Sequence, residues 1–230
     1  MADLVVRRVD YGFFVRPAAE TGTDLPRTEP CLGYVVEHPG GILLFDTGMG
    51  RDAGVDAHYR PRRRSLEQAL GGVGVDPEDV TELANCHLHF DHCGGNPRLD
   101  GRPVFTQAAE LADARHPADY TLPELVDTPG VRYVELYGET EVLPGVLLLP
   151  TPGHTAGHQS LVVRQRDGTV VVAGQSHEGA SAFSADVLAR SAHAEGHPQP
   201  LPTPPEWLDR LLAMDPARVV FAHDHAVWVP

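Results

Sequence analysis

Four potential metal ligands lie within six consecutive residues of this chain. The segment 87–92 reads His-Leu-His-Phe-Asp-His, in a sequence that holds 13 histidines. Imidazole nitrogens and carboxylate oxygens are the donors that zinc and similar ions accept. If the segment continues a strand, His87 and His89 share one side, because strand residues two apart lie on the same face. The pattern predicts a metal site, and its two adjacent ligand groups can hold two ions.

The cysteines near this segment allow an alternative metal site that includes a thiolate ligand. A structural zinc usually takes cysteines in paired spacing, which this chain lacks, and a histidine run can also be plain surface. Cys31, Cys86 and Cys93 are too few for a disulfide framework. Cys86 and Cys93 flank the segment 87–92, so either can supply a thiolate, although free cysteine more typically packs as a small buried residue.

Strands and turns around the segment predict how it is positioned. Gly41–Phe45 is apolar and follows a Pro-Gly turn, which indicates a buried strand with residues 32–37 as its hairpin partner. A strand over 80–86 delivers the histidines at its end, and the glycines at 94 and 95 allow a tight turn after them. Further strands are expected at 103–105, 146–149, 159–163, 169–173 and 219–222, and helices at 65–70, 107–114 and 204–214.

This order of elements predicts the fold class. Strands alternate with helices, yet several neighbouring strands are close enough to form hairpins, which favours mixed sheets covered by helices. The proline-rich segment 194–205 is interpreted as a surface loop, because too few residues follow it for a second domain. We therefore expect one domain over residues 1–230.

Composition narrows the function classes. The formal net charge of -14 disfavours a nucleic-acid binder, which needs basic surface to neutralise phosphates. No apolar run approaches the roughly 20 residues of a membrane helix, and residues 1–8 do not resemble a signal peptide, so we expect a cytoplasmic protein without membrane contact. The basic run 60–64 is either a solvated turn or a patch that receives an anionic substrate.

Together these motifs resemble the metallo-β-lactamase superfamily. Besides the segment 87–92, Asp46-Thr47-Gly48 after a buried strand is similar to its early Asp-Thr-Gly element. The run 151–158, Thr-Pro-Gly-His-Thr-Ala-Gly-His, resembles its next ligand loop, and 221–224 its last ligand at a strand end. The resemblance covers the chain from about residue 32 onward. It implies an α+β fold, an αββα sandwich of two mixed sheets with helices on the outer faces and metals at one edge.

Within the superfamily the N-acyl homoserine lactonases are most similar, on residues 89–96, 104–110 and 150–159. Cys93 departs from them, because they usually have a small residue there. The resemblance implies one ion held by His87, His89 and His154. It implies a second ion held by Asp91, His92 and His223.

The remaining polar residues near these motifs receive supporting roles. Asp46 orients a ligand or holds its turn, and His158 supports its loop. His225 lies two residues after His223 and competes with it for the ligand role. Zinc is the expected metal, as one or two ions, with iron or manganese as alternatives.

Two departures from the lactonase pattern concern the residues after 174. Where the family places an aspartate that bridges both ions, this chain has Gln175, which offers a neutral carbonyl oxygen. The outcomes are a dinuclear site with Gln175 as ligand, a single-metal site, or replacement by His177 or Glu178. The lactonases also place a tyrosine shortly afterwards to contact the substrate carbonyl, and here only His177 can donate such a hydrogen bond.

The predicted activity is hydrolysis of a lactone, ester or related carbonyl of a small molecule by metal-activated water. Asp91 is the catalytic residue that orients the nucleophile and passes a proton to the leaving group. Alternatives are a degenerate, non-catalytic member that binds a metal or ligand, a diiron redox protein, and a thioesterase for an anionic conjugate. A homodimer is possible.

Overall fold

The computed structural model of the chain describes residues 4–116 and 121–230. Residues 1–3, part of the stretch considered for a signal peptide, and residues 117–120 lie outside this description. Within the described part, no helix has the length and apolar character to cross a membrane.

The first sheet has seven strands in the order β4-β1-β2-β3-β5-β6-β7. β1, β2 and β3 pair antiparallel, whereas β3, β5, β6 and β7 are parallel, so this sheet is mixed. Its strands are β1 (Val5–Arg16), β2 (Arg27–His38), β3 (Gly41–Phe45), β4 (Arg62–Arg63), β5 (Val80–Ala84), β6 (Pro103–Gln107) and β7 (Arg132–Leu136).

The second sheet has five strands in the order β12-β11-β10-β9-β8. Only the β11–β12 pair is parallel; the others are antiparallel. Its strands are β8 (Thr140–Leu143), β9 (Val146–Pro150), β10 (Gln159–Gln165), β11 (Gly168–Val172) and β12 (Pro216–Val220).

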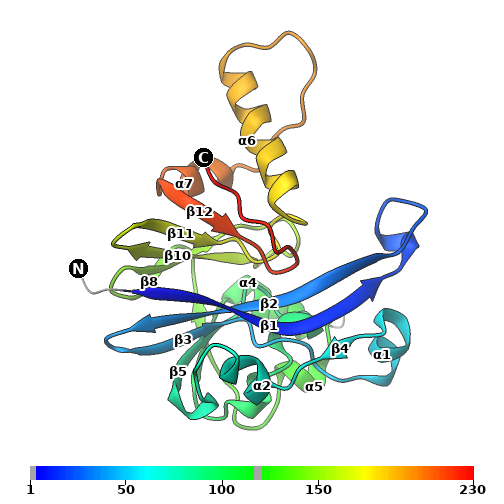
Figure 1. Cartoon of the computed structure of the whole chain (residues 1–230), viewed down its shortest axis with the longest axis vertical. Coiled ribbons are helices and arrows are strands. Elements are labelled where there is room, and N and C mark those ends of the chain that lie inside the picture. Colours follow the sequence, from blue (N-terminus) through cyan, green and yellow to red (C-terminus); the bar gives the residue numbers. More distant parts are fainter. Residues whose placement is uncertain (1–3, 117–120) are drawn as a thin grey trace.

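The two sheets pack face to face and helices cover the outer faces (Figure 1). Phe45 of the first sheet and Leu148 of the second belong to one fully buried cluster, which is the core between the sheets. Leu70 of α2 packs on the outside of the first sheet, and Leu208 of α7 on the outside of the second. The αββα sandwich is therefore confirmed. The α-helices are α1 (Ala53–Tyr59), α2 (Leu66–Gly71), α3 (Phe90–Cys93), α4 (Ala108–Ala114), α5 (Pro123–Val126), α6 (Ala180–Ala194) and α7 (Trp207–Leu212).

Strand direction brings the predicted motifs to one edge. β3 and β5 are parallel, so the residues after Phe45 and after Ala84 leave the first sheet at the same end. β11 and β12 are parallel as well, which does the same for the residues that follow Val172 and Val220. The connection between β9 and β10 holds residues 151–158. The sequence motifs are therefore loops at strand ends.

Several boundaries differ from the sequence predictions. The strand expected over 80–86 ends at Ala84, because the N–H of Cys86 donates to the side chain of Asp46 (2.8 Å) instead of a neighbouring strand. The helix expected over 204–214 covers only Trp207–Leu212, because consecutive prolines at 204 and 205 favour extended backbone before it. The final strand is Pro216–Val220 and not 219–222, so His223 lies in the loop beyond it.

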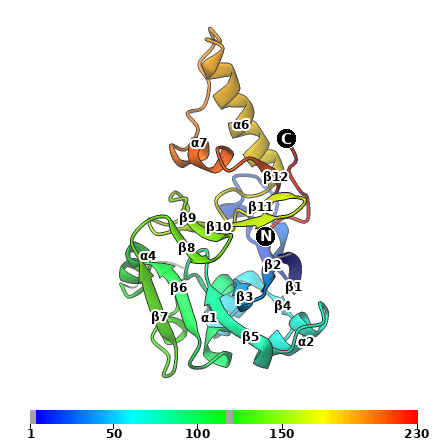
Figure 2. The ribbon, with the colours of Figure 1, turned by 90° about the vertical axis from the view of Figure 1, so that its left-hand side faces the viewer.

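The helix at 65–70 is confirmed as α2, with a capping box between Ser65 and Gln68. Two long elements were not predicted: strand β1 and helix α6. α6 and the loop after it project away from the sheets in both views (Figures 1 and 2), and the segment 195–205 is the expected loop without helix or strand.

Candidate metal centre

Three histidines from two loops form the first cluster of potential ligands. His87 and His89 follow β5, and His154 lies between β9 and β10. Nε2 of His154 is 3.2 Å from Nδ1 of His89, and the ring of His87 lies 4.4 Å from that of His89 and 4.6 Å from that of His154, centroid to centroid. One nitrogen from each ring lies within 4.8 Å of the other two.

Asp91, His92 and His223 form the second cluster. Asp91 and His92 belong to the short helix α3, and His223 follows β12. Nε2 of His223 lies 3.2 Å from Nε2 of His92, and Oδ2 of Asp91 lies 3.4 and 3.5 Å from these two nitrogens. The rings of His87 and His92, one from each cluster, are 4.1 Å apart. The two clusters therefore adjoin, as the sequence predicted.

These spacings fit a metal ion better than hydrogen bonding. Two nitrogens bound to one tetrahedral zinc at about 2.0–2.1 Å lie about 3.3–3.4 Å apart, close to the separations within both clusters. Nε2 of His87 is buried and has no hydrogen-bond partner among the described residues, although a buried polar atom normally has one. A cation facing these donors would satisfy that atom.

The protonation states also suit a cation. Burial and the nearby His92 lower the pKa of His87 well below its usual range. Burial lowers the pKa of His89 to about 4, so its ring is neutral at pH 7. Burial opposes ionisation of Asp91, yet the neighbouring His92 and His223 hold the pKa of this carboxyl well below its usual value. The first cluster thus offers neutral imidazoles. In the second cluster burial opposes protonation of His92, yet the neighbouring Asp91 and Asp46 help to raise its pKa well above the usual range, so this ring carries a proton that a bound cation would replace.

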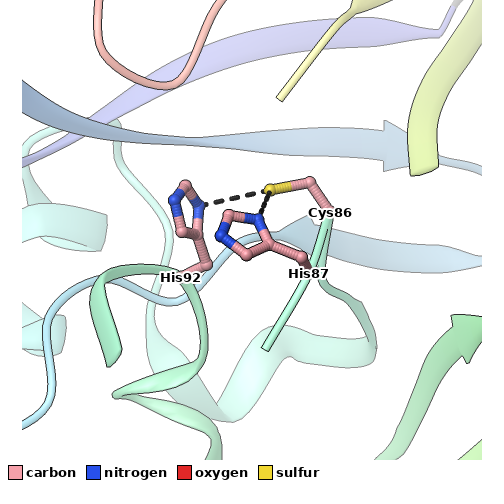
Figure 3. A group of neighbouring side chains, drawn as sticks. All are labelled: Cys86, His87 and His92. Atoms are coloured by element: carbon pink, nitrogen blue, oxygen red, sulfur yellow. Dashed lines mark hydrogen bonds between the residues drawn. The ribbon is translucent and has the colours of Figure 1, made fainter. Parts of the chain in front are cut away.

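Asp46 anchors the ligand loop from behind. It has a left-handed backbone (φ 63°), which directs the chain out of β3 and under residues 85–92. Its Oδ1 accepts the N–H of Cys86 at 2.8 Å, and its Oδ2 lies 3.0 Å from Nδ1 of His92. Cys86 itself lies beside the Nδ1 atoms of His87 and His92 (Figure 3). Asp46 therefore has the supporting position that the sequence predicted.

Gln175 lies where the sequence placed it, at the second cluster. Its Oε1 is 3.2 Å from Nε2 of His92. His158 supports this turn: its Nε2 accepts the backbone N–H of Gln175 at 3.1 Å while its Nδ1 lies 3.0 Å from the carbonyl oxygen of Thr151. His158 therefore contacts both the turn before Gln175 and the start of its own loop, and its supporting role stays a prediction.

The other candidates have partners away from both clusters. His177 lies 3.1 Å from a carboxylate oxygen of Asp186, and its ring packs against Phe183 and Trp207. Glu178 is exposed and pairs with Arg27. His225 is exposed, so the structure places His223, and not His225, with His92.

A cleft opens beside the clusters. Its walls are largely aromatic, and Arg16 of β1 reaches into it. Arg16 donates two hydrogen bonds to the Glu29 carboxylate, at 2.8 and 2.9 Å. The basic run 60–64 lies elsewhere, since Arg63 pairs with Asp56. Residues that line the cleft are Phe14, Arg16, Tyr59, His89, Phe90, Asp91, His154 and Gln175.

Sequence reasoning did not find Phe14, Arg16 or Tyr59. Phe14 and Arg16 come from the unpredicted strand β1, and Tyr59 is the last residue of α1. Nothing local to these two elements signals that they face residues some 30 to 160 positions later. The apolar residues at the alternate positions Val9, Tyr11 and Phe13 were the available signal for a strand there.

A family model described as the metallo-beta-lactamase superfamily matches residues 26–223. An N-acyl homoserine lactonase of Bacillus sp is 37% identical over 157 residues, which cover 62% of each chain. The N-acyl homoserine lactonase AttM of Rhizobium radiobacter is 27% identical over 161 residues, 59% of this chain and 60% of that one. The chain thus matches less than two thirds of the length of these relatives.

Solved structures show the same fold. An N-acyl homoserine lactone hydrolase, with the product N-hexanoyl-L-homoserine bound at the catalytic metal center, superposes with a TM-score of 0.74 at 24% identity, over 98% of this chain and 95% of the other. AidC, a dizinc quorum-quenching lactonase, superposes with a TM-score of 0.69 at 14% identity, over 100% and 91% of the two chains.

Proposed function

Since the chain belongs to the metallo-beta-lactamase superfamily, we propose that it is a metal-dependent hydrolase of lactones, with N-acyl homoserine lactones as the substrate class. The observation that carries this proposal is the pair of adjoining ligand clusters on the wall of an aromatic cleft. The similarity to N-acyl homoserine lactonases supports the substrate class.

The two donor sets support a proposal for the metal ligands. We propose that His87, His89 and His154 hold one zinc ion, and that Asp91, His92 and His223 hold a second, weaker one. Gln175 is a neutral neighbour of the second ion. When bound, zinc supplies Lewis acidity to the carbonyl group and activates water.

The chain's own residues complete the reaction. Hydrolysis adds water across the ring C–O bond, so one proton must reach the leaving oxygen. Asp91 is ionised, buried and part of the second cluster, which adjoins the first, so it accepts that proton from the attacking water and gives it to the leaving oxygen. Phe14, Tyr59 and Phe90 form an apolar wall, which excludes water and packs against an acyl chain.

Charge in the cleft argues against the thioesterase alternative. The guanidinium of Arg16 is already paired with Glu29, and the run 60–64 is not part of the cleft. An anionic conjugate would therefore meet no unpaired cation among the described residues that line this cleft.

We also propose a single domain over residues 1–230, a cytoplasmic location and no nucleic-acid partner. A homodimer stays a prediction, which sedimentation analysis would test.

Acid release from N-hexanoyl homoserine lactone tests the function. Protein purified without chelator should open the ring, and EDTA should remove activity until zinc is restored. His89→Ala and His154→Ala should lose turnover together with bound metal, whereas His225→Ala, an exposed histidine outside both clusters, should keep both. Turnover by a metal-free His89→Ala variant would refute metal dependence. Zinc-loaded wild type that is inert on this lactone and also on a panel of other lactones and esters would select the non-catalytic alternative.

A further inference from the structure

Cys86 has no role in the function proposed above, yet its thiol lies between two of the ligands. Sγ is 3.1 Å from Nδ1 of His87 and 3.3 Å from Nδ1 of His92, and the side chain is fully buried (Figure 3). The backbone N–H of the same residue donates to Asp46. Cys86 is therefore connected to His87, His92 and Asp46 at once.

The two histidines differ in what holds their rings. Nδ1 of His92 lies 3.0 Å from Oδ2 of Asp46, so a carboxylate accepts its proton and leaves Nε2 free for the second cluster. Nδ1 of His87 has no carboxylate neighbour among the described residues; its recorded contact is Sγ of Cys86. Nε2 of His87 is a buried atom that has no hydrogen-bond partner among the described residues. For Nε2 to present a lone pair, Nδ1 must carry the proton, and the sulfur must accept it.

We propose that Cys86 is a positioning residue, whose sulfur accepts the Nδ1–H of His87 and so directs Nε2 of that ring into the first ligand cluster. Asp46 performs this task directly for His92. For His87 it acts through Cys86, whose backbone it holds. The inference rests on the proposed metal-dependent function, because it assigns His87 to a metal through Nε2.

Packing fixes the sulfur in this place. A Cβ placed on Gly174 would meet Cβ of Cys86 at 2.5 Å and Sγ at 3.1 Å, so the thiol lies tightly under the turn that leads to Gln175. A longer acceptor would not fit there. Serine is the conservative substitution, since its hydroxyl is smaller and also accepts a hydrogen bond.

A competing geometry makes Cys86 a ligand itself. Sγ and the nearest nitrogens of His87 and His92 also lie within 4.8 Å of one another. An ion there would bind the two rings through Nδ1 and would compete with Asp46 for His92. It would leave Nε2 of His87 unpartnered. Positioning satisfies both nitrogens of His87, which is why we favour it.

Zinc affinity, measured by competition with a chromophoric chelator on the full chain, tests the proposal without relying on turnover. Cys86→Ala should weaken the tighter zinc by about 10- to 100-fold, the usual effect of losing a partner that orients a ligand. Cys86→Ser should restore affinity to within a few-fold of wild type. Cys93→Ala is the matched control, because Cys93 is equally buried and its Sγ contacts only the carbonyl oxygen of Leu88 in the recorded hydrogen bonds.

Two further measurements keep the proposal falsifiable if Cys86→Ala does not fold. In zinc-loaded wild type, nitrogen NMR of the histidine rings should show His87 protonated at Nδ1; protonation at Nε2 would overturn the proposal. In cobalt-substituted protein, a sulfur-to-cobalt charge-transfer band that Cys86→Ser abolishes would make Cys86 a ligand and also overturn it. Unchanged zinc affinity in Cys86→Ala would also overturn the proposal that Cys86 positions His87. Lack of lactone hydrolysis, with these affinities as expected, would refute only the substrate.

Discussion

Glu110 of α4 joins the two loops that carry the first ligand cluster, and its removal is our most specific prediction. One carboxylate oxygen accepts the backbone N–H of Leu88, between His87 and His89, at 2.7 Å. The other accepts the hydroxyl of Thr155, next to His154, at 2.5 Å. The Glu110 side chain is only 2% exposed. Glu110→Ala therefore detaches both loops from the same support.

The contacts set the size of the effect. Leu88 is fully buried, so its N–H would lose its partner without gaining water, which costs about 1–3 kcal/mol. Thr155 is half-buried and can reach water, so its lost bond costs about 1 kcal/mol. Burial also raises the pKa of Glu110, which means that removing the carboxyl recovers part of this cost. We expect the free energy of unfolding to fall by about 1–3 kcal/mol, which is less than the sum of the two lost bonds.

Urea unfolding of the metal-free chain measures this, because the metal then adds nothing to the difference. Glu195→Ala is the control: this glutamate is exposed at the end of α6 and should change stability by less than about 0.5 kcal/mol. Zinc binding to the first cluster should weaken only in Glu110→Ala. A free energy of unfolding within about 1 kcal/mol of wild type would show that Glu110 does not hold these loops.

Two other predictions concern charge. Gln175→Asp adds a carboxylate at the second cluster and should raise the affinity for the second zinc by at least about tenfold, measured by calorimetry. The control Gln199→Asp, on the exposed loop, should leave this affinity unchanged. Equal affinities in Gln175→Asp and wild type would refute our assignment of Gln175. Glu110→Gln tests the pH dependence: because burial raises the folded pKa of Glu110, its contribution is complete below the unfolded value near 4.3 and is lost as pH rises through the folded pKa. The stability of metal-free wild type relative to this variant should thus fall as the pH rises above about 4, and a constant difference would contradict it.

The ligand segment was predictable because its information is local. Segment 87–92 has metal-ligand residue types at a suitable spacing, and a predicted strand precedes it. Gly94 after the segment indicates a turn. That turn needs a glycine: a Cβ on Gly94 would meet the backbone N of Gly50 at 1.9 Å. Such a motif depends little on distant parts of the chain, so its shape follows from the sequence around it.

The long elements that the sequence did not predict are β1 and α6, which depend on packing against distant parts of the chain. Helix α6 has only Phe183 and Ala189 buried along its 15 residues, so it lacks the apolar stripe that reveals a helix in a sequence. β1 pairs with β2 over most of its length, and Arg16 reaches the cleft only because that pair is long. Neither feature leaves a periodic signal strong enough to read.

Gln175 is a case in which the sequence motif predicts the position of a residue, while its effect depends on the charges that surround it in the fold. The fold keeps the position: His158 holds the backbone N–H of Gln175, and its side chain reaches His92. What changes is charge, since a neutral glutamine, one methylene longer than aspartate, stands where the family resemblance implies a carboxylate. Asp91 is then the one carboxylate among the six clustered ligands, facing the charge of up to two divalent ions. Repulsion between the ions is therefore less compensated, and it acts on the second ion, whose cluster contains Gln175 as a neighbour. The loss of this negative charge weakens binding of the second ion but leaves the geometry of the first cluster intact. We therefore expect the same fold to hold one zinc tightly and one weakly.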